Sequence, residues 1–240
     1  MTAPNSKEAC AILAAARAEG RDALNETEAK RVLGAFGIAV PQGRLLSPAP
    51  PPGFAAGLSP PFVLKIVSRD ILHKTEAGGV RLGLADEAAA AAALAEMGAR
   101  ISALGHRVDG WLLEGMAPAG VEMVIGGIRD GRFGPVVMAG FGGILIELLQ
   151  DIAFAICPVD ALDADDMLVS LRGRAMLDGW RGAPPAAIGA LRDVLLRVGG
   201  KGGLLETLQA DIAELDINPL IVSPAGAVAA DARILLGARG

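Results

Sequence analysis

The stretch AELDINPLIVSPAGAVAADARIL, residues 213–235, holds two runs rich in aliphatic residues on either side of a Ser-Pro-Ala-Gly segment. If Ser223–Gly226 forms a four-residue loop, the two runs pair as an antiparallel hairpin. Val222 then lies opposite Ala227, and this pair sets the register of both strands. The stretch therefore predicts a hairpin whose cross-strand neighbours follow from the turn alone.

One face of this hairpin is predicted to be polar. The same register places Asn218 opposite Asp231 and Asp216 opposite Arg233. Because side chains alternate along a strand, these four share one face, while Leu215 and the aliphatic residues after it take the other. Two carboxylates and a carboxamide are hard oxygen ligands of the kind that Mg²⁺ takes together with phosphate oxygens. A solvated strand face explains the same pattern, so the geometry alone leaves both interpretations open.

The rest of the chain mixes helices and strands. Apolar periodicity and turn residues divide these elements into two groups, which predicts an α/β or α+β fold with two lobes, residues 1–113 and 114–240. The expected helices cover residues 7–19, 25–36, 87–104, 163–171 and 186–198; the expected strands cover 62–67, 80–84, 110–116, 121–128, 134–140, 144–149 and 153–156.

Composition excludes several classes of protein. The net charge is −5 and no basic patch stands out, which argues against nucleic acid or an anionic membrane as the main partner. No apolar run reaches the roughly 18 residues of a membrane span, and the N-terminus lacks a signal-peptide pattern. Cys10 and Cys157 are too few and too far apart for a disulfide framework or a zinc site. A cytoplasmic protein is expected.

Lys65 is a charged residue inside the apolar run FVLKIV, residues 62–67. With a period of two it shares a face with Val63 and Val67. A lysine on a buried face is costly unless it is paired. Two interpretations stay open: the side chain reaches solvent at an edge of the sheet, or it meets an anion such as a phosphate.

His73, one of two histidines, lies in the polar segment DILHKTEAGGV, residues 70–80. An imidazole is near neutral at cytosolic pH, so it can act as a nucleophile without a dedicated base. The Gly78-Gly79 pair permits backbone conformations closed to other residues. An ordinary surface histidine is the alternative.

Glu114 and Glu122 flank a bend between two expected strands. A strand, a bend and a second strand with exposed amides can bracket a flat heterocycle. The Gly-rich segment AGFGGILIE, residues 139–147, matches neither a P-loop nor a GxGxxG turn followed by a helix. The usual phosphate-binding fingerprints are therefore absent.

Three stretches in order resemble a known family. They are VLKIVSRDILHKTEAGGV (63–80), EGMAPAGVEMVIGGIRDGRFGPVVMAGFGGILIELLQDIAFAICPV (114–159), and LDINPLIV with AADARI (215–222 and 229–234). Together they closely resemble the ATP-grasp (β) subunit or domain of NDP-forming acyl-CoA synthetases, a group that includes the ADP-forming acetate–CoA ligases and is related to succinyl-CoA synthetase. The similarity runs from about Asn25 to Leu236.

The resemblance implies an ATP-grasp fold with ATP or ADP between two lobes, and a role for each candidate residue. His73 would be a phosphohistidine that passes a phosphoryl group to or from the nucleotide. Lys65 would hold the phosphates and Glu122 would lie near the ribose. Glu114, Gly115 and Met116 would form the hinge beside adenine, and Asp216, Asn218 and Asp231 would bind Mg²⁺.

The resemblance also implies a partner. In the family the acyl phosphate forms on a separate CoA-binding α subunit, in an α2β2-type assembly, and no such region is present in these residues. The Pro-rich segment 47–61 departs from the regular helix that is usual in the family. Two alternatives stay open: an ATP-grasp carboxylate–amine ligase, which needs no loop histidine, and a nucleotide-sensing subunit without catalysis.

Overall fold

The computed structural model describes residues 5–68, 71, 77–143 and 150–237. It divides into two compact units, one formed by residues 1–40 and 118–240 and the other by residues 41–117. Each unit has its own sheet and its own hydrophobic core. They are called the larger and the smaller unit below.

The larger unit contains a mainly antiparallel sheet with the order β10-β8-β5-β6-β7, and β9 pairs with β8. Its strands are β5 (Val121–Asp130), β6 (Gly134–Phe141), β7 (Ile152–Ile156), β8 (Ile212–Ser223), β9 (Gly226–Ala229) and β10 (Arg233–Leu236). Its helices are α1 (Ser6–Ala18), α2 (Glu26–Ala35), α5 (Ala161–Ser170), α6 (Ile188–Gly199) and α7 (Leu204–Thr207), with 3-10 turns η1 (Arg172–Met176) and η2 (Trp180–Gly182).

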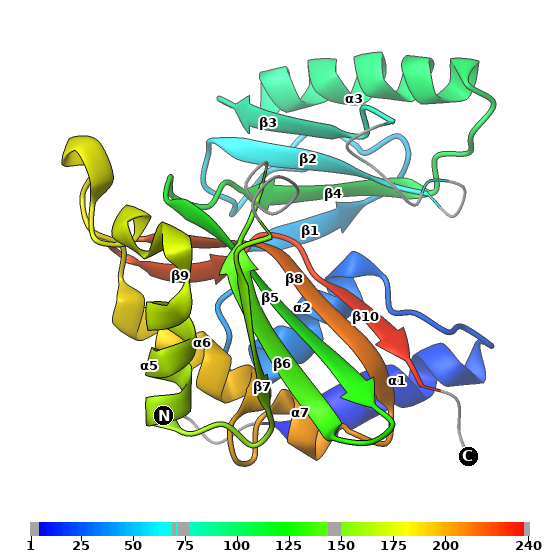
Figure 1. The fold of residues 1–240 in the computed structure, drawn as a ribbon. Coiled ribbons are helices and arrows are strands. Elements are labelled where there is room, and N and C mark those ends of the chain that lie inside the picture. The colour runs from blue at the N-terminus through cyan, green and yellow to red at the C-terminus, as the bar shows by residue number, and fades with distance from the viewer. Residues whose placement is uncertain (1–4, 69–70, 72–76, 144–149, 238–240) are drawn as a thin grey trace. The chain divides into compact units, whose positions relative to one another are not determined.

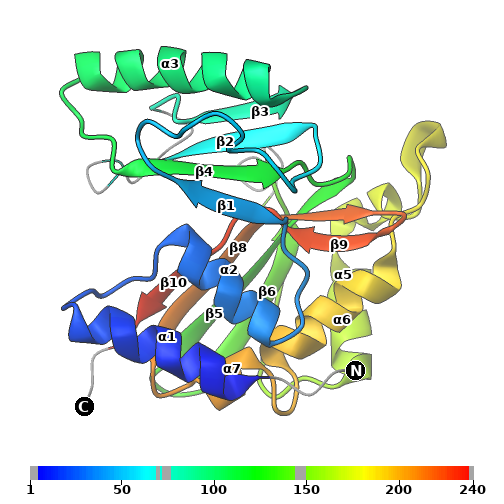
Figure 2. The ribbon, with the colours of Figure 1, turned by 180° about the vertical axis from the view of Figure 1, so that it is seen from behind.

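Helices cover one face of this sheet. Figures 1 and 2 show α1, α2, α6 and α7 on the same side of the strands. Met123 and Ile125 of β5 and Val137 and Ala139 of β6 point to that side and are almost fully buried. Their spacing of two residues is what a strand needs to bury one face only.

The N-terminal helices belong to the larger unit, which differs from the predicted division at residue 113. Backbone bonds tie them to β10, because the amide of Leu24 donates to the carbonyl of Ile234 (3.0 Å) and that of Leu236 donates to Asp22 (2.8 Å). The apolar side chains of α1 and α2 also pack in the core of the larger unit. Such pairing between chain ends leaves no local signal in the sequence.

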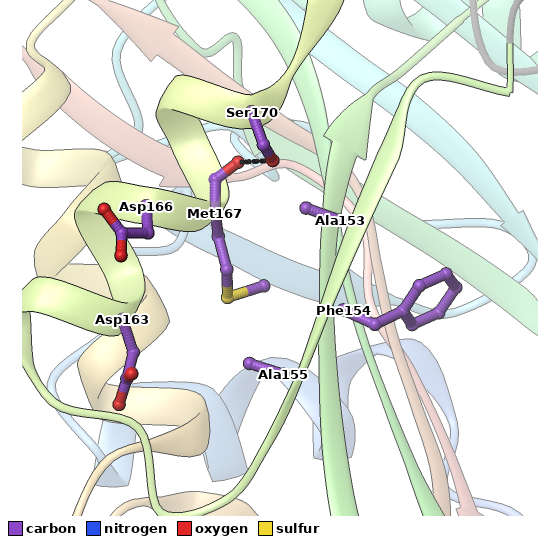
Figure 3. Close-up of a pocket in the computed structure, with 7 residues that line it drawn as sticks. All are labelled: Ala153, Phe154, Ala155, Asp163, Asp166, Met167 and Ser170. Carbon is purple, nitrogen blue, oxygen red and sulfur yellow. Dashed lines mark hydrogen bonds between the residues drawn. The ribbon is translucent and has the colours of Figure 1, made fainter.

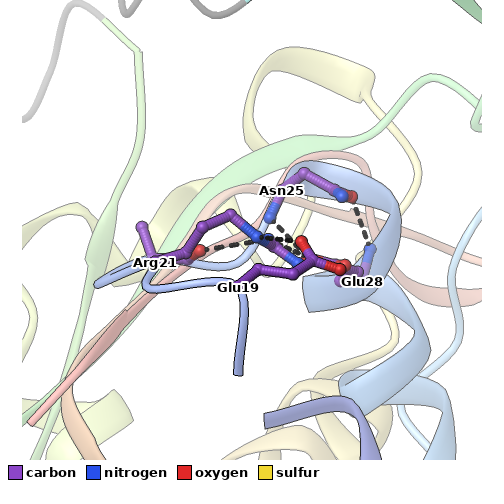
Figure 4. A network of polar contacts seen from close by, with 5 residues as sticks. Glu19, Arg21, Asn25 and Glu28 are labelled. Atoms are coloured by element: carbon purple, nitrogen blue, oxygen red, sulfur yellow. Dashed lines mark hydrogen bonds and ion pairs between the residues drawn. The ribbon is translucent and has the colours of Figure 1, made fainter. Parts of the chain in front are cut away.

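The turn from α1 into α2 is held by a polar network, shown in Figure 4. Asn25 and Glu28 form a capping box at the start of α2. Arg21 adds two bonds to the Glu28 carboxylate, at 2.6 and 2.8 Å. The hydrogen bond from Arg21 lowers the pKa of Glu28, against the effect of partial burial.

The smaller unit is a four-stranded sheet with one helix. The strand order is β1-β4-β2-β3. The elements are β1 (Gly43–Leu46), β2 (Phe62–Val67), β3 (Val80–Leu84), α3 (Glu87–Ala103) and β4 (Gly110–Gly115). Leu64, Ile66, Trp111 and Leu113 form one face of β2 and β4 and pack in a core with residues of α3. The other face carries Lys65.

Most predicted elements are present within one or two residues of their expected bounds. β1 was not predicted, and the second strand of the terminal hairpin is divided into β9 and β10. The strand expected over residues 144–149 lies outside the described residues. No helix in the described part of the chain is long and apolar enough to cross a membrane.

Candidate functional site: an acidic hairpin face and a buried ion pair

The terminal hairpin has the predicted register. Val222 lies opposite Ala227 in the β8–β9 ladder. Asp216 lies opposite Arg233 in the β8–β10 ladder. The position of Asp231 falls between β9 and β10, where the amide of Ala230 still bonds to β8 through the carbonyl of Pro219 (2.9 Å). The register set at the turn therefore holds as far as Leu235, after which it shifts by one residue.

The alternation of side chains holds only up to residue 218. Leu215 and Ile217 are buried, whereas Asp216 is half-buried and Asn218 is exposed. Beyond this point Leu220 is the next buried residue. The pairing of β8 with β5 shifts by one residue at the same place, so a bulge moves the apolar side chains to the other parity.

The surroundings of Asp216 shift the pKa of its carboxyl group. Burial raises the pKa of its carboxyl above the usual value. Arg233 opposes that shift, while the negative charges of Glu214 and Asp231 add to it. Arg233 also forms an ion pair with Glu214, so its positive charge is shared. The hairpin face thus carries more negative than positive charge.

These residues fit a magnesium ion. Asp216, Asn218 and Asp231 offer hard oxygen donors, and a divalent cation would relieve the excess negative charge. No group of three or more His, Cys, Asp or Glu side chains suited to a metal occurs in the described ranges. A site here would therefore depend on the Asn218 carboxamide and on oxygen atoms from phosphate.

Lys65 forms a buried ion pair within the smaller unit. Its Nζ lies 3.2 Å from Oε2 of Glu114, and the two side chains are 9% and 3% exposed. Val63 lies directly opposite Glu114, so Lys65 and Glu114 are diagonal neighbours on one face of adjacent strands. The pairing of the lysine with a protein carboxylate was not predicted, although each of the two is the single charged residue of its strand.

A glycine makes room for this pair. Gly43 of β1 lies directly opposite Glu114. A Cβ atom at Gly43 would lie 2.7 Å from Cγ of Glu114, closer than carbon atoms approach without displacement. A side chain at residue 43 would therefore push the carboxylate away from its position.

Two amides of the expected hinge are already bonded. The amide of Gly115 donates to the carbonyl of Gln42 (2.9 Å), and that of Met116 donates to Pro61 (2.8 Å). The Met116 side chain is exposed. A nucleotide base that bonded to these two amides would have to displace both hydrogen bonds. The backbone carbonyl groups of this segment could be contacted without such a displacement.

The remaining candidates have different surroundings. Glu122 is exposed on β5, and its backbone carbonyl accepts the amide of Gly142 (2.7 Å). Asp151 is buried, and its carboxylate accepts the amides of Arg172 (2.8 Å) and Gly173 (2.7 Å), a structural role that the sequence did not reveal. His73 lies outside the described residues.

The predicted residues thus form two groups. Asp216, Asn218, Asp231 and Glu122 belong to the larger unit, while Lys65 and the hinge belong to the smaller one. Residues 15–236 match the ATP-grasp domain family. The chain therefore belongs to the ATP-grasp family.

Individual relatives show which members of the ATP-grasp family this chain is similar to. The chain is 36% identical over 228 residues to the β subunit of acetate–CoA ligase [ADP-forming] I of Pyrococcus furiosus, covering 94% of this chain and 96% of the relative. The β subunit of the second ligase of that organism is also 36% identical, over 95% of this chain and 98% of the relative. The chain is thus similar over almost its whole length to β subunits of ADP-forming acetate–CoA ligases. It also matches 30% of the length of a longer relative, acetate–CoA ligase [ADP-forming] I of Archaeoglobus fulgidus, at 35% identity.

Solved structures agree with this placement. The dinucleotide-forming acetyl-coenzyme A synthetase 1 of Ca. Korarchaeum cryptofilum, in complex with coenzyme A and Ca-AMPCP, is 37% identical with a TM-score of 0.87, covering 94% of this chain and 98% of that one. A second structure of that enzyme, with coenzyme A and Mg-AMPPCP, has its phosphohistidine segment pointing towards the nucleotide-binding site (37% identity, TM-score 0.82, 95% and 100% coverage).

Proposed function

We propose that this chain is the β subunit of an NDP-forming acyl-CoA synthetase, which interconverts acid, CoA and ATP with acyl-CoA, ADP and phosphate. In this proposal the chain binds the magnesium nucleotide, and His73 carries the phosphoryl group between the nucleotide and a CoA-binding α subunit. The complex acts in the cytoplasm as an α2β2-type assembly.

The observation that carries the proposal is the hairpin face. A half-buried Asp216 with a raised pKa, next to Asp231 and Asn218, destabilises the folded protein when it is ionised, unless a cation binds there. It occurs in a chain that is similar over almost its whole length to ligase β subunits. A bound Mg²⁺ would supply positive charge to the phosphate oxygens there.

The roles of the other residues are those that the resemblance to the family implies. Lys65 exchanges part of its contact with Glu114 for phosphate oxygens when the nucleotide binds, and Glu114 to Met116 lie beside the base. Glu122 reaches the ribose. Transfer to His73 forms a P–N bond to the imidazole and breaks the bond between the γ-phosphorus and the bridging oxygen, so ADP leaves with the electron pair. Positioning and electrostatics supply most of the catalysis in such a step.

A labelling experiment tests the relay. Incubation with Mg²⁺ and γ-labelled ATP should label the chain with an acid-labile, base-stable phosphoryl group. His73→Ala should abolish the label, while His106→Ala, the only other histidine, should keep it. Label that persists without His73 would refute the relay, and a wild-type chain without label would favour a carboxylate–amine ligase or a sensing subunit.

A second experiment tests the metal site. Asp231→Asn conserves shape but removes a charge, so affinity for the nucleotide in the presence of Mg²⁺ should fall about tenfold or more. Affinity without Mg²⁺ should change little. Isothermal titration with and without the ion measures both, and an unchanged dependence on Mg²⁺ would remove Asp231 from the site.

The partner is tested by reconstitution. The isolated chain should bind nucleotide and label itself but make no thioester from ATP, acid and CoA. Addition of the CoA-binding subunit should restore turnover, which a panel of short-chain, branched and aryl acids would then characterise. Thioester made by the purified chain alone would contradict this division of labour.

A further inference from the structure

Within the described residues, β7 is an edge strand of the larger sheet, with no strand paired on its outer side. It pairs with β6 on one side and ends the strand order. Its sequence, Ile-Ala-Phe-Ala-Ile, has no charge and no proline, and none of its five residues is buried. Natural edge strands are usually protected by charges, prolines or bulges, because an open edge pairs with other chains. A bare apolar edge therefore indicates that another segment covers it.

The outward backbone groups of β7 can be identified. The amide of Cys157 donates to the carbonyl of Pro135 (2.9 Å), and the amide of Phe141 donates to that of Asp151 (3.4 Å). In an antiparallel pair every second residue bonds to the neighbouring strand. The backbone groups of Ile152, Phe154 and Ile156 therefore point away from β6 and are oriented to accept an added strand.

The sheet face beside this edge is apolar. Phe154 lies opposite Met138, and Ile156 lies opposite Val136. Val136 in turn lies opposite Ile128, so these side chains share the face that is opposite the helices. Phe154, Ile156 and Ile128 are 59%, 55% and 48% exposed.

The area of this apolar face matches one side of an interface. Together with Phe133 at the β5–β6 turn, which is 60% exposed, these side chains expose on the order of 400 Å². That is about the apolar share of the roughly 800 Å² that each partner contributes to a standard interface.

A groove between β7 and α5, with carboxylates on its α5 wall only, lies on the other side of β7. It has a volume of about 370 Å³, and Asp163, Asp166 and Ser170 of α5 face Ala153 and Ala155 of β7 across it. Figure 3 shows Met167 between the helix and the strand, and the ring of Phe154 directed away from α5. An added strand would thus have an apolar face on one side and carboxylates on the other.

Two kinds of segment could pair with the edge of β7, one from a second copy of this chain and one from a different chain, and their charges distinguish them. A second copy of this chain would bring two sets of Asp163 and Asp166 to the same edge, and each copy has a net charge of −5. Like charges that close together are unfavourable. A basic segment would instead pair with both aspartates, so charge complementarity favours a different chain.

We propose that the edge of β7 is the docking site for an extended segment of the CoA-binding partner subunit. This segment pairs with Ile152, Phe154 and Ile156 as an added strand. It places apolar side chains on the Phe154 face and Lys or Arg side chains next to Asp163 and Asp166. The inference rests on the proposed function, because that function requires such a subunit.

The test uses the full chain together with the CoA-binding subunit of the same enzyme, with affinity measured by titration. Phe154→Lys should weaken the complex at least about tenfold and Asp166→Lys about fivefold, in line with the loss of an interface anchor and of a charge pair. Leu82→Lys, on the edge strand β3 of the other sheet, and Asp193→Lys, an exposed aspartate of α6, are the matched controls and should change affinity less than twofold.

Hydrogen exchange provides an independent readout. Complex formation should slow exchange at the amides of Ile152, Phe154 and Ile156, while amides of α3 keep their rate. Unchanged exchange at β7 in a formed complex, equal affinity of the variants and the wild type, or a wild-type dimer joined through β7 would each overturn the docking site. Failure of the wild-type chain to bind the subunit would overturn it too. Self-phosphorylation is measured in parallel on each variant. If the docking site is overturned but the label on His73 still forms, the proposed function is retained; if the label is also missing, the proposed function fails as well.

Discussion

The two units differ in how the charges of their candidate site residues are balanced. In the smaller unit, Lys65 and Glu114 are both buried and neutralise each other at 3.2 Å. In the larger unit, Asp216 lies on a half-open face with Asp231 and Glu214 nearby, and the charge of Arg233 only partly opposes the rise in its pKa. The first group is electrically complete without a ligand, whereas the second keeps an excess of negative charge.

This difference separates two tasks that the proposed function assigns to the two units. A buried neutral pair holds its geometry before the ligand arrives, because neither charge tolerates separation in a low-dielectric environment. An excess of carboxylate charge instead raises affinity for a cation, since the cation relieves repulsion that is already present. A variant that removes one charge of the buried pair should therefore destabilise the smaller unit, whereas a variant that removes the charge of Asp216 should stabilise the larger one.

The largest expected effect comes from breaking the buried pair. Glu114→Leu leaves the Lys65 ammonium without its carboxylate and should lower the free energy of unfolding by about 3–5 kcal/mol. Denaturant unfolding measures this loss. The double variant Lys65→Met with Glu114→Leu should recover most of it, and a double variant as unstable as the single one would show that the pair is not the cause.

A smaller effect is expected when the pair is displaced. Gly43→Ala places a methyl group against Glu114 and should cost about 1–3 kcal/mol, as overpacking does. The matched control is Gly34→Ala in α2, where no atom lies within 4 Å of the new methyl group. There the better helix propensity should stabilise the chain by about 0.5–1 kcal/mol. Equal effects at the two glycines would refute the steric argument.

The Arg21–Glu28 pair is a partly exposed reference for the buried one. Glu28→Gln should cost about 1 kcal/mol at neutral pH, because solvent weakens such pairs. The pKa of Glu28 is lowered from 4.5, so its contribution is complete above that value and is lost as the pH falls through the lowered pKa. The difference between wild type and variant should therefore shrink in acid. A difference independent of pH would mean that the ion pair contributes nothing.

The smallest effect, with the opposite sign, is expected at Asp216. Its raised pKa means that the folded state holds the proton more tightly than the unfolded state, so ionisation above that pKa destabilises the fold. Asp216→Asn should raise the melting temperature slightly at neutral pH, and this advantage should vanish as the pH falls through the raised pKa. The stabilisation of the fold by Mg²⁺ and nucleotide should decrease in the same variant. A lower melting temperature at neutral pH would show that Arg233 outweighs burial.

The hairpin shows how far local reasoning extends. Its register followed from the Ser-Pro-Ala-Gly loop, and Asp216 faces Arg233 as expected. The alternation failed beyond Asn218, because a bulge against β5 changes the parity of the buried residues. That bulge depends on a third strand from a distant part of the chain. It could therefore not be predicted from the sequence of the hairpin.

Lys65 shows the same limit in the candidate site. The sequence marked it as a costly charge in an apolar strand, but its partner depends on β4 lying between β1 and β2. The strand order of a sheet is set by contacts between residues far apart in the chain, and periodicity carries no information about it. The room left by Gly43 opposite Glu114 is a consequence of that order as well.

The sequence by itself determined the elements, the hairpin register, the acidic face and, through its motifs, the family. These features depend on residues within a turn or two of one another, where steric and hydrogen-bonding preferences act directly. Only the tertiary structure decided that residues 1–40 join the C-terminal part, that Lys65 meets Glu114 and that β7 ends the strand order of the described sheet. Each of these requires segments that are distant in the chain to pack together, and the free energy of such packing belongs to the whole core and to no single stretch of it.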